Sequence, residues 1–229
     1  MALRAITGDI DSGEANARMT LEAVSGFLDE TPDNCRNNYG ANMTARAITG
    51  DIGSGKSTAS RILAEILGCP CLNADDIAKT MWHRDDVKAC AISRWGKDIL
   101  DASGKIIMPI IAERIFSAKS EHDFCNSLIH PLVMTELQTL SRNLDDVVLE
   151  IPLLPEAGRP QWIDSAIYIT ADFALRAERR RLQRGWNPDE LRRREEFLLP
   201  QSERISMCEH VIHNDSSINE LQRKLEEII

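Results

Sequence analysis

Residues 50–57 read Gly-Asp-Ile-Gly-Ser-Gly-Lys-Ser and match the spacing G-x-x-x-x-G-K-[ST] at every required position. The short stretch before them, residues 45–49, contains the β-branched side chains typical of a strand. Residues 59–67 follow with apolar side chains at helical spacing. The chain is therefore expected to run from a strand through a glycine-rich turn into a helix. This arrangement wraps backbone N–H groups around a phosphate.

The phosphate-binding loop predicts a P-loop NTPase fold, which is an α/β fold with a parallel sheet and helices on both faces. The ammonium of Lys56 is expected to bridge the β- and γ-phosphates of ATP, and the hydroxyl of Ser57 is expected to ligate Mg²⁺. ATP and Mg²⁺ are therefore the predicted cofactors. The residues of the loop expected to bind the nucleotide are Gly50, Asp51, Ile52, Gly53, Ser54, Gly55, Lys56, Ser57 and Thr58.

The loop has a decayed second copy near the N-terminus. Residues 4–10 are identical to residues 46–52. In this copy the position of Lys56 is taken by Glu14, whose carboxylate would repel a phosphate. The first copy therefore cannot act as a phosphate-binding loop.

This repeat divides the chain into two parts. A lone strand–turn–helix fragment cannot bury its own apolar face, and residues 27–42 are rich in Asp, Asn, Pro and Gly. We therefore predict that residues 1–42 are a degenerate and mobile extension, which arose by duplication or precedes a true start at Met43. Residues 43–229 are predicted to form the catalytic domain.

The charge of the chain limits its partners. The 229 residues carry a formal net charge of −9, and an acidic surface disfavours nucleic acid and anionic lipid. No apolar run approaches the ~18 residues that span a bilayer. The six cysteines form no C-x-x-C pair, as expected of free thiols in a reducing compartment. We predict a cytosolic monomer, bound to neither nucleic acid nor membrane, whose cations for an anionic ligand are concentrated in one patch.

Three classes of P-loop protein compete: a small-molecule kinase, a GTPase-like switch, and a nucleotide-binding protein without transfer activity. The sequence has neither the N-K-x-D element of a GTPase nor the S-G-G-Q signature of an ABC-type ATPase. A kinase needs an acid to orient the acceptor hydroxyl and mobile arginines to cover the transferred phosphoryl group. Residues 70–76 indicate a short strand that ends in carboxylates, which makes Asp75 the candidate acid. Capping of the next helix is the alternative role for this aspartate.

A cluster of arginines supplies the second feature of a kinase. Arg180 and Arg184 lie four residues apart on one helical face, so both can point at the same anion. A solvated helix face is the alternative, but the density of arginines in an acidic chain favours a phosphate-covering lid over about residues 176–201. The predicted catalytic residues are therefore Lys56, Asp75, Arg180 and Arg184.

Further short motifs follow in order along the chain: Ala74-Asp75, Trp95-Gly96, Ile99-Leu100, Gly104-Lys105-Ile106, Arg114-Ile115-Phe116, Leu128-Ile129-His130-Pro131-Leu132, Pro152-Leu153-Leu154 with Glu156, and Val211-Ile212 with Asn214. With the loop and the lid, they make the chain, over about residues 44–229, similar to the dephospho-CoA kinase family. The resemblance implies ATP-dependent phosphorylation of the ribose 3′-hydroxyl of dephospho-CoA to give CoA. The alternatives are another small-molecule or nucleoside-monophosphate-type kinase, or a nucleotide-binding protein without transfer activity.

The resemblance also implies which residues bind the acceptor. Asp75 would orient the acceptor hydroxyl and take its proton. His130 precedes Pro131 at an expected helix start, where a structural cap or a buried hydrogen bond is the alternative role. A helical acceptor-binding insert would span about residues 76–142. The implied acceptor-binding residues are Asp75, Arg114, His130, Pro152 and Leu153.

Two further positions have expected roles near the nucleotide. Glu150, near the end of a buried-type strand, is expected to hold Mg²⁺ through water, because such strand ends face the ligand crevice. Asn214, after an expected strand, is placed near the adenine, with a turn role as the alternative. The chain departs from the family pattern at Asn73, Met108 and Leu198, which concern acceptor binding and leave the loop, Asp75 and the lid intact.

The predicted extension can be tested by truncation. A chain that begins at Met43 should keep the activity and the melting temperature of the full chain, because the first repeat copy lacks the residues that bind a phosphate. Turnover assays and thermal unfolding of the two chains measure this. A large loss of either property would contradict the prediction.

Overall fold

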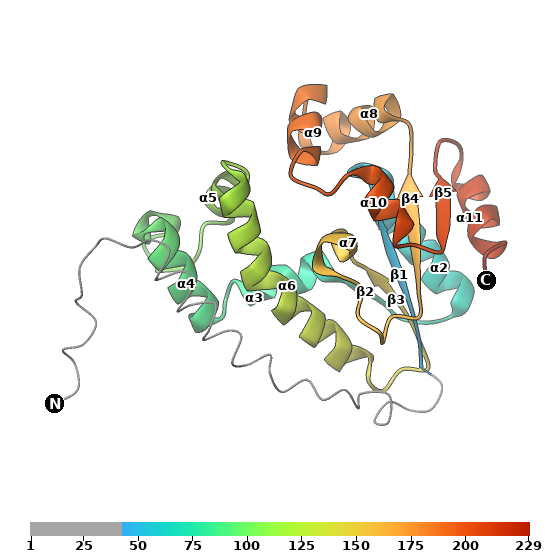
Figure 1. Ribbon diagram of the computed structural model, residues 1–229, viewed down its shortest axis with the longest axis horizontal. Coiled ribbons are helices and arrows are strands. Elements are labelled where there is room, and N and C mark those ends of the chain that lie inside the picture. The colour runs from blue at the N-terminus through green and yellow to red at the C-terminus, as the bar shows by residue number, and fades with distance from the viewer. Residues whose placement is uncertain (1–42) are drawn as a thin grey trace. The chain divides into compact units, whose positions relative to one another are not determined.

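A five-stranded parallel sheet organises residues 43–229, the part of the chain that the computed structural model describes. All its strand pairings are parallel, so the carboxyl ends of the strands meet at one edge. The predicted extension, residues 1–42, lies outside the described residues. In the sheet order β2-β3-β1-β4-β5 the strands are β1 (Thr44–Gly50), β2 (Cys71–Asn73), β3 (Asp146–Glu150), β4 (Ser165–Thr170) and β5 (His210–His213) (Figure 1).

Helices cover both faces of the sheet, which confirms the predicted fold class. Ile48 of β1 packs with α2 (Lys56–Leu67) and α11 (Ile218–Glu226) in one apolar core. Its neighbour Ala47 points to the opposite face and belongs to a second core, built with the helices that follow β2. Because both faces are buried, the inner strands are near-continuous apolar runs rather than alternating ones.

The chain between β2 and β3 is helical. It covers the region predicted as the acceptor-binding insert, whose function stays a prediction. Within residues 43–229 no helix combines the length and hydrophobicity needed to cross a membrane. The helical elements of this region are α3 (Ala74–Met81), α4 (Asp85–Trp95), the short 3₁₀ helix η2 (Lys97–Ile99), α5 (Met108–Ile115) and α6 (Lys119–Ser141).

The predicted lid, about residues 176–201, covers most of one helix and the whole of a second, and a third helix starts where it ends. Gly185, in the left-handed conformation with φ 69°, ends the first helix. Asn187 starts the second, because its side-chain oxygen accepts the Glu190 N–H at 2.8 Å. The elements are α8 (Phe173–Arg184), α9 (Pro188–Glu195) and α10 (Gln201–Ser206), while α7 (Leu154–Ala157) follows β3 (Figure 1).

The predicted helix start at His130 is wrong. Helix α6 continues through Pro131, which lies inside it. A proline there removes one backbone hydrogen bond. The helix tolerates this loss because side chains on both sides of the proline, such as Ile129 and Val133, are buried in the core. Tertiary packing has overridden the local preference of proline.

Gly50 closes β1 against β4 with no room for a side chain. A Cβ atom at this position would lie 2.0 Å from the carbonyl oxygen of Ile169, and the backbone φ is +141°. We expect Gly50→Ala to lower the free energy of unfolding by at least about 3 kcal/mol, because it combines overpacking with backbone strain. Urea unfolding measures the change.

Gly68→Ala is the matched control. This glycine also has a positive φ, +64°, but a Cβ atom there meets nothing within 4 Å. The substitution should cost about 1 kcal/mol, from backbone strain alone. Equal losses in the two variants would show that the contact with Ile169 does not matter.

Candidate active site

A cavity of about 940 Å³ lies among the phosphate loop, the starts of α2 and α3, the end of β3, the lid and the segment after β5. Gly50, Asp51 and Ser54 do not line it. Lys56 and Asp75 do, so the two predicted catalytic groups from separate elements share one space. The predicted site residues that line this cavity are Ile52, Gly53, Gly55, Lys56, Ser57, Thr58, Asp75, Glu150, Pro152, Arg180, Arg184 and Asn214.

Side chains from other elements hold the phosphate loop in place. The Asn214 amide donates to the Ser54 carbonyl at 2.8 Å, and Arg179 donates to the carbonyls of Ser54 and Asn214 at 3.2 and 2.9 Å. A Cβ atom at Gly55 would lie 2.4 Å from the Asn214 amide nitrogen, so this brace needs glycine there. Asn214 therefore has a structural role as well as a place on the cavity wall, and its proximity to adenine stays a prediction.

The side chain of Asp51 does not line the cavity, so the predicted contact of this residue with the nucleotide stays a prediction and would involve its backbone. Its buried carboxylate accepts hydrogen bonds from Tyr168, Thr170 and Gln201 at 2.7, 2.6 and 2.8 Å and pairs with Arg204 at 3.0 Å. Burial acts to raise the pKa of Asp51, but the hydrogen bonds and the nearby arginines outweigh it and lower the pKa. The carboxylate thus anchors the loop to β4 and α10.

Lys56 is buried at the start of α2. Its ammonium donates to the carbonyls of Gly50 and Asp51 at 3.1 and 2.8 Å. Burial lowers the pKa of Lys56 to about 8, against the opposing charge of Glu150. An anion entering the loop would favour the charged form of the lysine.

Asn73, and not Asp75 or Asp76, caps helix α3. Its side-chain oxygen accepts the N–H groups of Asp75 and Asp76 at 2.8 and 3.3 Å, so Asn73 is the N-cap of α3. The alternative that Asp75 caps this helix is therefore wrong, and its side chain lines the cavity instead. Burial raises the pKa of Asp75, with Lys56 opposing the rise. A carboxylate of raised pKa is a better proton acceptor.

Ser57 and Glu150 form the pair of oxygen ligands expected for Mg²⁺. The Ser57 hydroxyl donates to one Glu150 oxygen at 2.6 Å, and the Asn73 amide donates to the other at 2.7 Å. Mg²⁺ takes such hard oxygen ligands and usually needs only one or two from the protein, with waters and substrate phosphates as the others. No cluster of three or more His, Cys, Asp or Glu in residues 43–229 could hold a metal by itself. The residues present therefore fit a metal that depends on the nucleotide phosphates.

The five arginines of α8 divide into two groups. Arg180 and Arg184, predicted as catalytic, both line the cavity. The Nε atom of Arg180 is buried and has no hydrogen-bond partner in the described part of the chain. Burial, followed by the like charge of Arg184, lowers the pKa of Arg180. The other three have protein partners: Arg176, Arg179 and Arg181.

A second cavity of about 230 Å³ lies between α3, α6 and the turn after β3, with mostly apolar walls. His130, Pro152 and Leu153, three of the predicted acceptor ligands, line it. Burial, together with the charge of His122, lowers the pKa of His130 to about 4, so its imidazole is neutral at physiological pH. Asp75, Phe116 and Pro152 line both cavities, which therefore meet at these residues.

The predicted contact of Arg114 with the acceptor is not supported by its position. This residue lines neither cavity, and its guanidinium pairs with Asp98 at 2.6 Å on the exposed side of α5. The sequence analysis also missed residues that the fold brings to the cavity: Phe116, Trp186 and Arg194. Residues 192–194 are consecutive arginines, and such a run is typical of a solvated face.

Fold and site together define the class of the protein, an ATP-dependent P-loop kinase. The family model for dephospho-CoA kinase matches residues 45–220. Dephospho-CoA kinases from Chlorobaculum tepidum and Fusobacterium nucleatum are 34% and 32% identical to the chain, over 73% of its length and 84% and 87% of theirs. The crystal structure of TT1252 from Thermus thermophilus matches with a TM-score of 0.66 at 27% identity, over 82% of this chain and 96% of that one. The chain belongs to the dephospho-CoA kinase family.

The Asp51 anchor makes stability depend on pH. We expect Asp51→Asn to lower the free energy of unfolding at neutral pH by about 3–5 kcal/mol, because it removes one partner of a buried ion pair. The pKa of Asp51 is lowered by folding, so its stabilisation is present above the unfolded pKa and is lost as pH falls through the folded value. The difference between wild type and variant should therefore shrink below about pH 4.

Urea unfolding at neutral and acidic pH checks this expectation. Asp146→Asn is the matched control, because it breaks the more exposed pair with Arg46 and should cost less than about 1 kcal/mol. A difference for Asp51→Asn that stays constant with pH would contradict the role of the charged carboxylate.

Proposed function

We propose that this protein transfers the γ-phosphoryl group of ATP to the ribose 3′-hydroxyl of dephospho-CoA, which yields CoA and ADP. The observation that carries the proposal is the position of Asp75, which lines both the polar cavity of Lys56 and the apolar cavity of His130. Membership in the dephospho-CoA kinase family supports this acceptor. The protein acts as a cytosolic monomer, without a nucleic-acid or membrane partner.

The nucleotide binds in the larger cavity. The N–H groups of the glycine-rich loop and the start of α2 surround its phosphates, and Lys56 exchanges its carbonyl partners for phosphate oxygens. Ile218 has an exposed apolar side chain and lines the cavity beside Leu221 and Asn214. These side chains offer an apolar and hydrogen-bonding wall for the base.

The acceptor binds so that its 3′-hydroxyl faces Asp75. The carboxylate of Asp75 accepts the hydroxyl proton as the oxygen attacks the γ-phosphorus and the bond to the leaving ADP oxygen breaks. The raised pKa of Asp75 matches this role. His130, Pro152 and Leu153 line the apolar cavity next to this carboxylate and position the rest of the acceptor.

The lid supplies positive charge to the transferred group. Arg180 and Arg184 neutralise oxygens of the γ-phosphoryl group in the transition state, and the buried Nε of Arg180, which has no partner in residues 43–229, is available for one of them. Closure of the lid over the cavity excludes the water that would otherwise hydrolyse ATP.

Mg²⁺ accompanies the nucleotide in this proposal. Ser57 and Glu150 are the residues that would hold it, directly or through water. When bound, the ion would offset the negative charge of the phosphate groups during transfer. Asn73 keeps the Glu150 carboxylate oriented towards Ser57.

The assay is ADP formation from ATP with dephospho-CoA, compared with nucleosides, nucleoside monophosphates and shikimate. We expect turnover to be highest with dephospho-CoA. Asp75→Asn should lower kcat about 10²–10⁴-fold, because it removes the proton acceptor. Its affinity for ATP should change little, since the loop and Lys56 are intact.

Lys56→Ala is the companion variant and should abolish turnover while the protein stays folded, as judged by its melting temperature. Turnover with a different acceptor would replace the substrate in this proposal. Absence of turnover with every acceptor would favour a nucleotide-binding protein without transfer activity.

A further inference from the structure

We infer that Arg194 binds the diphosphate group of the acceptor and so selects acceptors that carry one. The inference rests on the proposed function, since it concerns the same acceptor. Arg194 lies on α9 of the lid and lines the larger cavity together with Asp75 and Phe116.

The guanidinium of Arg194 is held between two aromatic rings. Its central carbon lies 4.2 Å from the ring centre of Phe116, at the end of α5, and 4.2 Å from that of Trp186, between α8 and α9. The side chain is only 18% exposed. Such stacking fixes the plane of a guanidinium and leaves its edge free for hydrogen bonds.

That edge has unused donors. The Nε atom of Arg194 donates to Glu190 at 2.7 Å, but the structure records no acceptor for the two terminal nitrogens among residues 43–229. Hydrogen bonds from Arg193, and then from Arg194, lower the pKa of Glu190 to about 2, although burial opposes this shift. The carboxylate that orients Arg194 is therefore charged. Two parallel terminal N–H groups are the geometry that binds phosphate oxygens in pairs.

The other basic residues nearby have different roles. Arg192 pairs with Asp189 away from the cavity, and Arg193 pairs with Glu190 and donates to the Phe116 carbonyl at 2.8 Å. Arg180 and Arg184 are assigned to the transferred phosphoryl group. Lys56 is assigned to the nucleotide phosphates, and Arg179 holds the loop carbonyls. Among the described residues that line this cavity, Arg194 is therefore the cation left for a second anionic group.

The acceptor needs such a cation. The diphosphate of dephospho-CoA is attached to the same ribose that carries the reacting 3′-hydroxyl, so it must lie near Asp75. The ionisable side chains that line the apolar cavity are Asp75, His122, Cys125 and His130. Burial lowers the pKa of both histidines, and the Cys125 thiol carries no positive charge in either form. This cavity therefore supplies no cation of its own. Arg194 reaches the junction of the two cavities from the lid, through its contact with Phe116.

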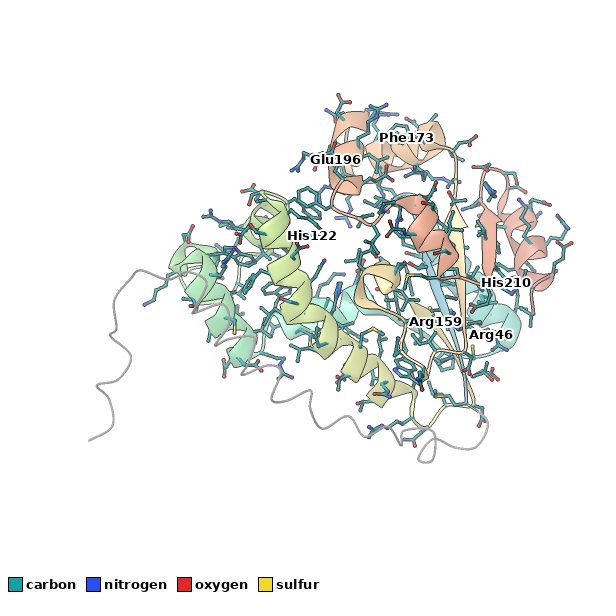
Figure 2. All side chains as sticks on the ribbon, in the orientation of Figure 1. Arg46, His122, Arg159, Phe173, Glu196 and His210 are labelled. Atoms are coloured by element: carbon teal, nitrogen blue, oxygen red, sulfur yellow. The ribbon has the colours of Figure 1, made fainter. Side chains whose placement is uncertain are left out.

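The same contact joins the lid to the insert. Phe197, just after α9, packs edge-on against Phe116 with ring centres 5.5 Å apart and lies 5.3 Å from the ring of His122 on α6. Figure 2 labels His122 on this helix and Glu196 just after α9. Lys119 of α6 donates to the Phe197 carbonyl at 3.3 Å. Because Arg194 sits in this junction, binding of the diphosphate would also favour the closed lid.

The test measures binding at equilibrium with the full chain. Calorimetric titration of dephospho-CoA without ATP gives its Kd for wild type, Arg194→Met, Arg194→Lys and Arg192→Met. We expect Arg194→Met to weaken binding about tenfold to a hundredfold, as for loss of charged hydrogen bonds. Arg194→Lys should show a smaller loss, because it keeps the charge without the paired donors. Arg192→Met, on the same helix but outside the cavity, should bind like wild type.

Titration of ADP with the same proteins separates the two halves of the cavity. The Kd for ADP should stay unchanged in Arg194→Met, and melting temperatures confirm that the variant is folded. Unchanged binding of dephospho-CoA, or an equal loss of ADP binding, would overturn the inference while leaving the proposed function in place. Failure of wild type to bind or phosphorylate dephospho-CoA would instead overturn the proposed function, and the inference with it.

Discussion

The phosphate loop is rich in glycine, and the rest of the site depends on the contacts that hold this loop in its conformation. A loop rich in glycine has few side chains with which to fix its own shape. Here the buried carboxylate of Asp51 ties the loop to β4 and to Arg204 of α10, while Arg179 and Asn214 hold its far side by the Ser54 carbonyl. The backbone of the loop can therefore present its N–H groups to a phosphate without reorganising first, and the Lys56 ammonium only has to exchange its carbonyl partners. Preorganised donors of this kind stabilise developing charge most effectively.

The same anchors connect the loop to the lid. Arg176 of α8 donates to the Ile52 carbonyl and pairs with Glu195 of α9, while Gln201 and Arg204 of α10 both reach Asp51. The lid is thus connected at both of its ends to the phosphate loop. Its middle, with Trp186 and Arg194, contacts the helical insert through Phe116. This arrangement places Arg180, Arg184 and Arg194 on the wall of the larger cavity.

The side chain of Asp75 is not needed as a helix cap, because Asn73 caps α3. Asn73 can accept hydrogen bonds with its oxygen and donate one with its nitrogen, so one side chain both caps α3 and orients Glu150. An aspartate in this place could accept but not donate at neutral pH. With the cap supplied by Asn73, the carboxylate of Asp75 has no hydrogen bond to the protein within the described range, and it faces both cavities. Its raised pKa follows from this burial.

The local spacing of residues was enough to predict the phosphate loop and the strand and helix that flank it, because these depend on contacts between near neighbours in the chain. The fold class and the class of cofactor follow from this strand–loop–helix motif. The family motifs predicted which side binds the acceptor. The tertiary structure alone decided which side chains face the cavity. It turned Asp51 inward to Arg204, 153 residues away, left Arg114 outside, continued α6 through Pro131 and brought Arg194 against Phe116. The direction of a side chain is set by packing between elements distant in sequence, and no periodicity within one helix or strand encodes it.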